Sequence, residues 1–174
     1  MKHITTTLLL CLLLTLVLVS SALAAQTCNK SIASTTPEAR FTVRNDGTAT
    51  HKPTGLTWMR CSLGQSWDGK TCSGAAAVFT WGGALQAASR HAFAGHTDWR
   101  LPNKNELASI VEEACTAPAI NEKVFPATPS VFFWSSSPYA GLAHGAWSVD
   151  FGFGPVNASV KTGNLPVRLV RGGM

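Results

Sequence analysis

The chain has 174 residues, of which 45% are hydrophobic and 13% are charged, and its formal net charge is +5. This length suits one domain with a real core, and the chain contains no internal repeat and no low-complexity segment. Its Lys and Arg residues are scattered rather than clustered, so nucleic-acid binding is not expected, whereas the mild positive charge favours acidic glycans or an anionic cell surface.

The first 25 residues have the features of a secretory signal peptide. Lys2 and His3 precede an apolar run from Leu8 to Val19, and an Ala-x-Ala pattern ends at Ala24 or Ala25, after which we expect cleavage. The run is short for a spanning helix of about 20 residues, which argues against a membrane anchor. We therefore predict export to the periplasm or cell exterior, with no transmembrane anchor after cleavage, an N-terminal tail over residues 26–40 and one domain over residues 41–174.

Four cysteines remain after cleavage, namely Cys28, Cys61, Cys72 and Cys115. An even number in an exported protein indicates two disulfides, for which three pairings are possible. We favour Cys61–Cys72, which closes a short glycine-rich loop, and Cys28–Cys115, which ties the tail to the end of a helix. A zinc site is the weaker alternative because no Cys-x-x-Cys occurs, so we predict no metal.

Turn signals and periodicity predict the next elements. Residues 40–50 read as a hairpin around Asn45-Asp46-Gly47, and residues 56–59 read as a further strand. Residues 61–74 are a loop rich in Gly, Ser and Asp. Thr80 is placed to cap a helix that ends near Arg90.

A second helix is predicted over residues 104–114 by its local chemistry. Pro102 disfavours helix in Leu101, Asn103 stands at the N-cap position, and Glu106 follows three residues later as a capping box requires. Leu107, Ile110, Val111 and Ala114 then fall on one helix face. The Trp99-Arg100 pair is therefore held just before the N-terminus of this helix.

The C-terminal part reads as strands over residues 131–135, 146–153, 156–161 and 167–170. In the second of these, Trp147, Val149, Phe151 and Phe153 alternate on one face. Two helices followed by several antiparallel strands give an α+β domain.

Five segments together resemble the Lcl C-terminal domain family, a bacterial domain of largely unknown function named after part of a collagen-like surface adhesin. The resemblance extends over residues 41 to 171. The five segments are Thr54–Trp58, Asp98–Leu107, Pro118–Asn121, Phe133–Tyr139 and Val167–Arg171. The resemblance implies the formylglycine-generating-enzyme branch of the C-type lectin fold, with two helices packed on twisted antiparallel strands. It also implies structural roles for Trp99, Arg100, Leu101, Pro102, Glu106, Trp134, Arg168 and Arg171.

Catalysis does not carry over from that branch, because the enzyme depends on cysteines in its C-terminal half and no cysteine here follows Cys115. The calcium-dependent sugar motifs of true C-type lectins, such as Glu-Pro-Asn, are absent. The histidines show no metal-ligand spacing, Ser135–Ser137 lack the Gly-x-Ser-x-Gly context, and the serines are expected to satisfy backbone groups. We therefore expect neither an enzyme nor a cofactor.

The acidic residues are expected to be structural. Asp98 is predicted to form an ion pair beside Arg100, Glu112 and Glu113 to lie on a solvated helix end, and Asp150 to be exposed or paired with Arg168 or, as we favour, Arg171. Five tryptophans are predicted to be core residues, namely Trp58, Trp81, Trp99, Trp134 and Trp147.

Ligand binding is expected in the late loops, which display the variable surface in lectin-like folds of this branch. The candidate ligand-binding residues are Trp67 in the cysteine-bounded loop and Tyr139, His144, Asn157, Lys161 and Asn164 near the C-terminus. The leading hypothesis is a secreted, non-catalytic adhesion module for an acidic or sulphated glycan or an envelope protein. The alternatives are an enzyme remnant of the formylglycine-generating type and an accessory domain of an envelope or pilus assembly, and the oligomeric state is left open.

Overall fold

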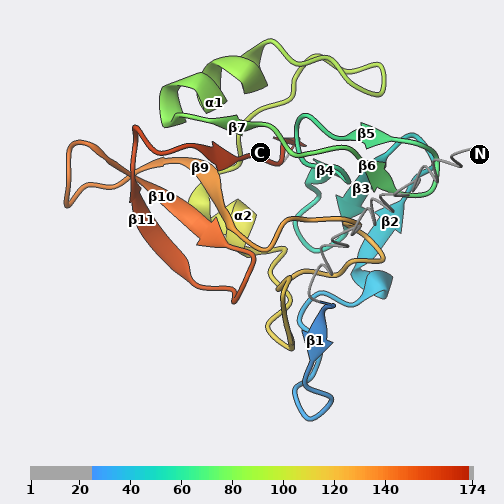
Figure 1. The fold of residues 1–174 in the computed structure, drawn as a ribbon. Helices are drawn as coiled ribbons and strands as arrows, with labels where there is room; N and C mark the ends of the chain where they lie inside the picture. Colours follow the sequence, from blue (N-terminus) through green and yellow to red (C-terminus); the bar gives the residue numbers. More distant parts are fainter. Residues whose placement is uncertain (1–24, 173–174) are drawn as a thin grey trace, which may run out of the picture.

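The computed structural model in Figure 1 describes residues 25–172. The predicted signal peptide lies almost entirely outside these residues. Within them, no helix is both long enough and apolar enough to cross a membrane.

The described chain is a β-rich α+β domain with two short α-helices, as the sequence predicted in outline. Helix α1 spans Trp81–Ser89, helix α2 spans Lys104–Ala108, and a 3-10 turn covers Glu38–Arg40. The strands are β1 (Thr27–Cys28), β2 (Phe41–Val43), β3 (Thr48–His51), β4 (Thr57–Met59), β5 (Ser66–Trp67), β6 (Cys72–Ser73), β7 (Val78–Phe79), β8 (Cys115–Thr116), β9 (Phe132–Pro138), β10 (Gly145–Asp150), β11 (Val156–Val160), β12 (Leu165–Pro166) and β13 (Val170–Arg171).

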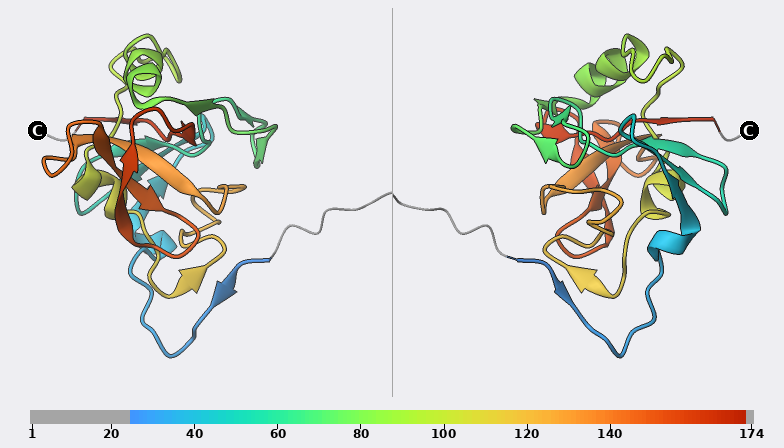
Figure 2. Two further views of the ribbon diagram at one scale, coloured as in Figure 1. Left: turned by 60° about the vertical axis from the view of Figure 1, so that its left-hand side comes forward. Right: turned by 90° about the vertical axis from the view of Figure 1, so that its right-hand side faces the viewer.

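Two sheets form the body of the domain. A four-stranded sheet has the order β13-β4-β3-β2, and a three-stranded sheet has the order β11-β10-β9. Three further two-stranded antiparallel sheets, β1-β8, β12-β7 and β5-β6, lie outside these two sheets. The arm that carries β1 projects from the body, and β1 is held there by antiparallel pairing with β8 (Figure 2).

The two helices cover opposite faces of the β9–β10 pair. Leu107 of α2 packs in one buried cluster with Phe133 and Val149, whereas Ala84 of α1 packs in another with Trp134 and Ala146. Successive side chains of a strand point to opposite faces, so neighbours such as Phe133 and Trp134 enter different clusters. The end of the sheet that carries the β9–β10 loop therefore lies between the starts of the two helices.

Several local predictions are confirmed. The hairpin of β2 and β3 turns at Gly47, whose φ is +84°, and Thr80 caps α1 by accepting a hydrogen bond from the Gly83 N–H. Asn103 and Glu106 form the predicted capping box. Both favoured disulfides, Cys28–Cys115 and Cys61–Cys72, are present.

The predicted helix over 104–114 is too long, because α2 ends at Ala108. Ile110 and Val111 are buried as their spacing indicated, but Val111 forms an isolated bridge with Ile120, and the Glu112 N–H donates to the Ala119 carbonyl. A β-type contact with a distant segment thus replaces the last helical turns. In consequence Cys115 lies in strand β8 rather than at a helix end.

Two predicted strands are also corrected. Strand β10 ends at Asp150, and Phe153, expected to continue its apolar face, lies in the following turn with 75% of its surface exposed. Of the predicted strand over 167–170, only Val170 is in a strand, β13, while residues 167–169 form an irregular stretch between β12 and β13. That stretch nevertheless pairs its backbone, because the Val167 and Leu169 carbonyls accept from the Leu63 and Met59 N–H groups.

The predicted ion pair of Asp98 is present but with another partner, and the predictions for Asp150 and Glu112 are wrong. Asp98 pairs with Arg171 at 2.8 Å, whereas Arg100 pairs with Glu106. Asp150 is buried and accepts from the Gly152 N–H instead of pairing with Arg171. Glu112 is buried as well, with 3% of its surface exposed, rather than solvated; Glu113 beside it is exposed. Of the predicted core tryptophans, Trp58, Trp99 and Trp134 are buried, but Trp81 and Trp147 are only half-buried.

Candidate functional site

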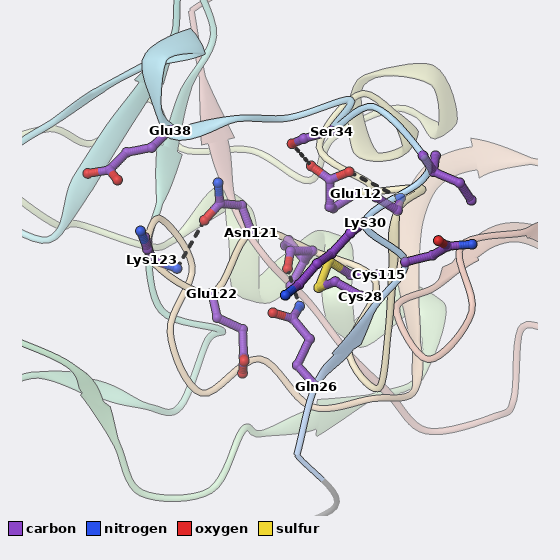
Figure 3. A pocket seen from close by; sticks show the side chains of 14 residues that line it. Gln26, Cys28, Lys30, Ser34, Glu38, Glu112, Cys115, Asn121, Glu122 and Lys123 are labelled. Atoms are coloured by element: carbon purple, nitrogen blue, oxygen red, sulfur yellow. Dashed lines mark hydrogen bonds between the residues drawn. A yellow bond between two sulfur atoms is a disulfide. The ribbon is translucent and has the colours of Figure 1, made fainter.

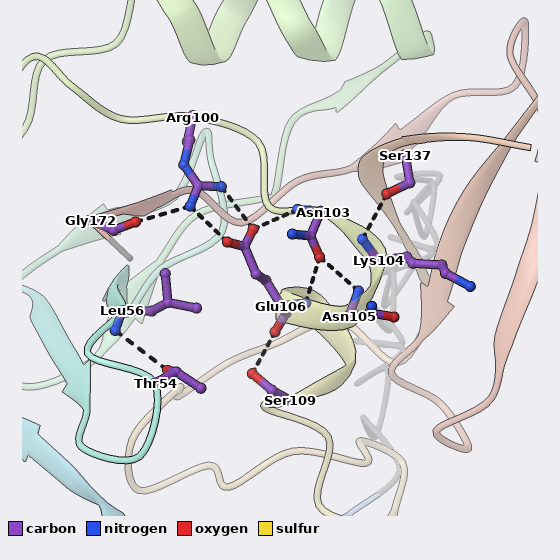
Figure 4. Close-up of polar contacts among 10 residues, drawn as sticks. All are labelled: Thr54, Leu56, Arg100, Asn103, Lys104, Asn105, Glu106, Ser109, Ser137 and Gly172. Atoms are coloured by element: carbon purple, nitrogen blue, oxygen red, sulfur yellow. Dashed lines mark hydrogen bonds and ion pairs between the residues drawn. The ribbon is translucent and has the colours of Figure 1, made fainter. Parts of the chain in front are cut away.

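Arg100 and the capping residues Asn103 and Glu106 hold the start of helix α2 rigidly in place (Figure 4). Arg100 donates from both terminal nitrogens to the Glu106 carboxylate, at 2.8 and 2.7 Å, and Glu106 also accepts from the Asn103 N–H at 2.7 Å. Asn103 in turn accepts from the N–H groups of Asn105 and Glu106. A two-bond guanidinium–carboxylate pair fixes orientation as well as distance, so the first turn of α2 has one defined position.

This arrangement places Lys104 beside an aromatic ring of the three-stranded sheet. The Lys104 N–H donates to the Ser137 hydroxyl at 3.1 Å, which joins the first residue of α2 to the end of β9 (Figure 4). The Lys104 ammonium then lies 4.5 Å from the ring centre of Trp147 on β10. An ammonium over an indole face is attracted by the negative face of the ring.

Tyr139 completes the aromatic part of this end of the sheet. Its ring meets Trp147 edge to face, with 4.8 Å between centroids. The loop after Tyr139 folds back onto the same ring, because a Cβ added at Gly141 would lie 2.7 Å from ring atoms. The close approach requires glycine at that position and holds the loop of residues 139–145 against the tyrosine.

A second lysine is held on the other side of this loop. The Lys161 ammonium donates to the Ala143 carbonyl at 2.8 Å and lies 4.6 Å from the ring centre of Trp81. Trp81 is fixed by its indole N–H, which donates to the Ser135 carbonyl, and the Lys161 N–H donates to the His144 carbonyl. The loop is thus flanked by two lysine–tryptophan pairs.

We call this set the cationic-aromatic surface and define it as Tyr139, His144 and the pairs Lys104–Trp147 and Lys161–Trp81. Neither lysine has a carboxylate partner within residues 25–172, where the ion pairs are Arg100–Glu106 and Arg171–Asp98. Their positive charges are therefore not neutralised within the described chain, and both tryptophans are half-buried. The surface offers fixed cations next to apolar ring faces.

The structure brings together three of the six ligand-binding residues predicted from the sequence, Tyr139, His144 and Lys161. Asn157 lies exposed on β11, and Asn164 lies exposed before β12, so neither belongs to this group. Sequence reasoning missed Lys104 and assigned Trp81 and Trp147 to the core. The pattern held a signal for Lys104, since the residue after an N-cap Asn is held in position by the cap, but nothing in the sequence placed it against Trp147.

Trp67, the sixth predicted residue, lies at a separate place. Its indole N–H donates to the Asn45 carbonyl at 2.8 Å, and the Arg60 guanidinium lies 4.1 Å from its ring centre. Trp67 lines a cleft of about 320 Å³ together with Met59, Cys61, Leu63, Gly64, Gln65, Ser66, His91 and Phe93. Like Trp81, this tryptophan has its N–H and one ring face engaged within the fold, and what separates it from the cationic-aromatic surface is its place on β5.

A cavity of about 520 Å³ lies under the N-terminal arm next to the Cys28–Cys115 disulfide (Figure 3). Its most buried acid is Glu112, which accepts from the Ser34 hydroxyl and from the backbone N–H groups of Thr35, Thr36 and Ala114. Burial alone would raise the pKa of Glu112, but these hydrogen bonds outweigh it and lower the pKa to about 2. The carboxylate is saturated by its own chain and ties the arm to the body.

The serines and histidines discussed in the sequence analysis make structural contacts in the described residues. Within residues 25–172, no group of three His, Cys, Asp or Glu residues is close enough to hold a metal ion. The serines act structurally, because the Ser135 hydroxyl donates to the Trp147 carbonyl and the Ser137 hydroxyl accepts from Lys104. Burial lowers the pKa of His91, and His91 packs against Phe93 rather than beside a nucleophile.

Comparison with known proteins identifies one family. The family model described as the Lcl C-terminal domain matches residues 47–171, which is most of the chain and includes the whole cationic-aromatic surface. No curated protein matches the chain.

Proposed function

We propose that this chain, which belongs to the Lcl C-terminal domain family, is an exported, non-catalytic binding module that holds an acidic polysaccharide on its cationic-aromatic surface. The fold that we propose for it is the C-type-lectin-like fold of the formylglycine-generating branch. The two disulfides support export, because such bonds persist in oxidising compartments outside the cytoplasm.

The observation that carries the proposal is the pair of lysines, each stacked on a tryptophan on either side of one loop, that have no carboxylate partner in the part of the chain that the structure describes. A sulphate or carboxylate group attracts a lysine ammonium, while the C–H face of a sugar ring packs on an indole. The two Lys–Trp pairs offer both contacts next to each other. Because Ser137 and Ala143 fix the two lysine-bearing segments, little freedom has to be lost on binding.

The shape of the surface fits a long ligand better than a small molecule. Its members lie around a loop at the end of a sheet, and none of them lines either of the two cavities described above. A polysaccharide can cross such an open surface and contact both lysines, whereas a small substrate would lack enclosure.

The test is a binding titration with a sulphated polysaccharide, heparin, and a neutral one, dextran. Heparin should bind at low salt and weaken at least about tenfold between roughly 0.05 and 0.5 M NaCl, because salt screens exposed charges. Lys104→Gln and Lys161→Gln should each weaken heparin binding about three- to tenfold, as expected for loss of one charge contact.

Lys70→Gln is the control, because Lys70 is an exposed lysine in the β5–β6 turn, on the opposite side of the molecule from the half-buried Lys104 and Lys161 (Figure 1). It should change heparin binding less than about twofold. The proposal fails if heparin does not bind, if dextran binds equally well, or if Lys70→Gln weakens binding as much as the other two variants.

A further inference from the structure

Strand β11 (Val156–Val160) is an open edge of the three-stranded sheet. It pairs with β10 on one side, and on the other side four of its five residues are exposed. Val156 and Val160 have 38% and 51% of their surfaces exposed, although valine is a residue of sheet interiors. An edge strand with apolar side chains is a template for another strand.

The hydrogen-bond register shows which groups of β11 face outward. Lys161 donates to His144, and Asp150 donates to Pro155, so the pairs 144/161 and 150/155 are hydrogen-bonded. Hydrogen-bonded pairs alternate along an antiparallel ladder, so the N–H and C=O groups of Val156, Ala158 and Val160 point away from β10. The Val160 carbonyl accepts from Gly163, and the other outward groups have no partner among the described residues.

Lysine and proline residues often prevent an edge strand from pairing with another strand, but the lysine and the proline next to β11 do not block its outer edge. Lys161 follows the strand, but its ammonium is held by the Ala143 carbonyl and the Trp81 ring. Pro155 precedes the strand, but it sits at a position that faces β10, so its missing N–H does not interrupt the outer edge. No charged residue and no bulge occurs in the β10–β11 register.

We propose that this edge pairs antiparallel with β11 of a second copy of the chain, about a two-fold axis at Ala158. The two Ala158 residues then exchange hydrogen bonds, and the Val160 N–H of each copy donates to the Val156 carbonyl of the other. The Val156 side chain faces Val160 of the second copy, and Asn157 faces Ser159. The strand is self-complementary in this register, because apolar residues meet apolar ones and no like charges are opposed.

The pairing makes one continuous sheet from the two three-stranded sheets. Helix α2 contacts β9 and β10, so the exposed valines of β11 are left uncovered in a single copy and meet across the axis in the pair. Each copy keeps its β9–β10 loop next to the Val160 end of its own β11. This inference concerns assembly and does not depend on the ligand proposed above.

Sedimentation velocity of the disulfide-bonded protein over about 5–500 µM should show a concentration-dependent dimer, as mass action requires. Val156→Lys combined with Val160→Lys should raise the dimer dissociation constant at least about tenfold, because the new ammonium groups face each other across the axis. Ala158→Pro should do the same, since it removes an outward N–H without touching the β10 ladder. Val78→Lys, at an exposed valine of β7, should leave the dimer unchanged.

A cross-link gives an independent measurement that does not depend on dimer strength. Residues facing each other in a hydrogen-bonded antiparallel pair have Cα atoms about 5.5 Å apart, within reach of a disulfide. Ala158→Cys should therefore form a covalent dimer on mild oxidation, and Val78→Cys should not. The proposal is overturned if the protein sediments as a monomer throughout, if Val78→Lys dissociates the dimer as strongly as the β11 variants, or if Ala158→Cys fails to cross-link.

Discussion

The guanidinium of Arg168 lies 4.8 Å from the ring centre of Phe125 and is completely buried. It has no carboxylate partner among residues 25–172; it donates instead to the carbonyls of Met59 and Arg60 and to the Thr128 hydroxyl. Burial lowers the pKa of Arg168 to about 9, which leaves it charged at neutral pH. One cation thus joins the end of β4, the segment before β9 and the C-terminal stretch between β12 and β13.

We predict that Arg168→Met destabilises the protein by about 3–5 kcal/mol, because buried acceptors lose their donor. Urea unfolding at pH 7 measures the change in free energy of unfolding. Arg90→Met is the control, since Arg90 is exposed and should change the free energy by less than about 0.5 kcal/mol. Equal stability of the two variants would show that the buried guanidinium is dispensable.

Glu112 should make stability depend on acidity. Its folded pKa is about 2, below the usual value of 4.5, so the unfolded chain binds the proton more tightly. The stabilisation is complete above pH 4.5 and disappears as the pH falls toward 2, with a total on the order of 2–3 kcal/mol. Thermal melting between these pH values should therefore show a steeper loss for the wild type than for Glu112→Gln.

Glu113→Gln is the matched control for that experiment, because Glu113 is adjacent and exposed. It should keep the acid dependence of the wild type. If Glu112→Gln also keeps that dependence, another acid is responsible for it.

The Cys61–Cys72 bond should contribute less to stability than Cys28–Cys115. The first closes a loop with a sequence separation of 11 and the second one of 87. Chain-entropy estimates then predict losses of about 2–3 kcal/mol for Cys61→Ala with Cys72→Ala, and about 4–5 kcal/mol for Cys28→Ala with Cys115→Ala. Denaturant titrations of the two double variants give the order, and the reverse order would contradict the prediction.

The cap of α2 should be worth about 1 kcal/mol, because Asn103 satisfies two backbone N–H groups at the helix start. Asn103→Ala removes those bonds, whereas Asn105→Ala removes an exposed amide two residues later that caps nothing. Urea unfolding should show the loss for the first variant only. A similar loss in both would mean that the side-chain cap is unimportant.

Local chemistry in the sequence predicted much of the fold. The caps at Thr80 and Asn103, the turn at Gly47 and the start of both helices depend on residues within four positions of each other, so a single sequence contains the information. The helix over 104–114 failed for the opposite reason. Its apolar spacing reports burial, and the Val111–Ile120 bridge that ends the helix involves another segment.

The charged residues show the same division. Sequence neighbours suggested Asp98 with Arg100, but the fold brings Arg171 to Asp98 and leaves Arg100 for Glu106. Glu112 was predicted to be solvated because its hydrogen-bond donors, Ser34 to Thr36, lie far away along the chain. Ion pairing and burial depend on distances in space, which charge patterns along the sequence do not contain.

The sequence by itself determined the family, the α+β class and the capped helix starts, since these follow from composition, local motifs and chain order. The ligand-binding role of Tyr139, His144 and Lys161 stays a prediction. Only the tertiary structure decided that Lys104 meets Trp147, that Lys161 meets Trp81 and that β11 has a free edge. The physical reason is that hydrogen bonding within a turn involves neighbours in the chain, whereas packing between α1, α2 and the sheet brings together residues whose positions in the sequence are unrelated.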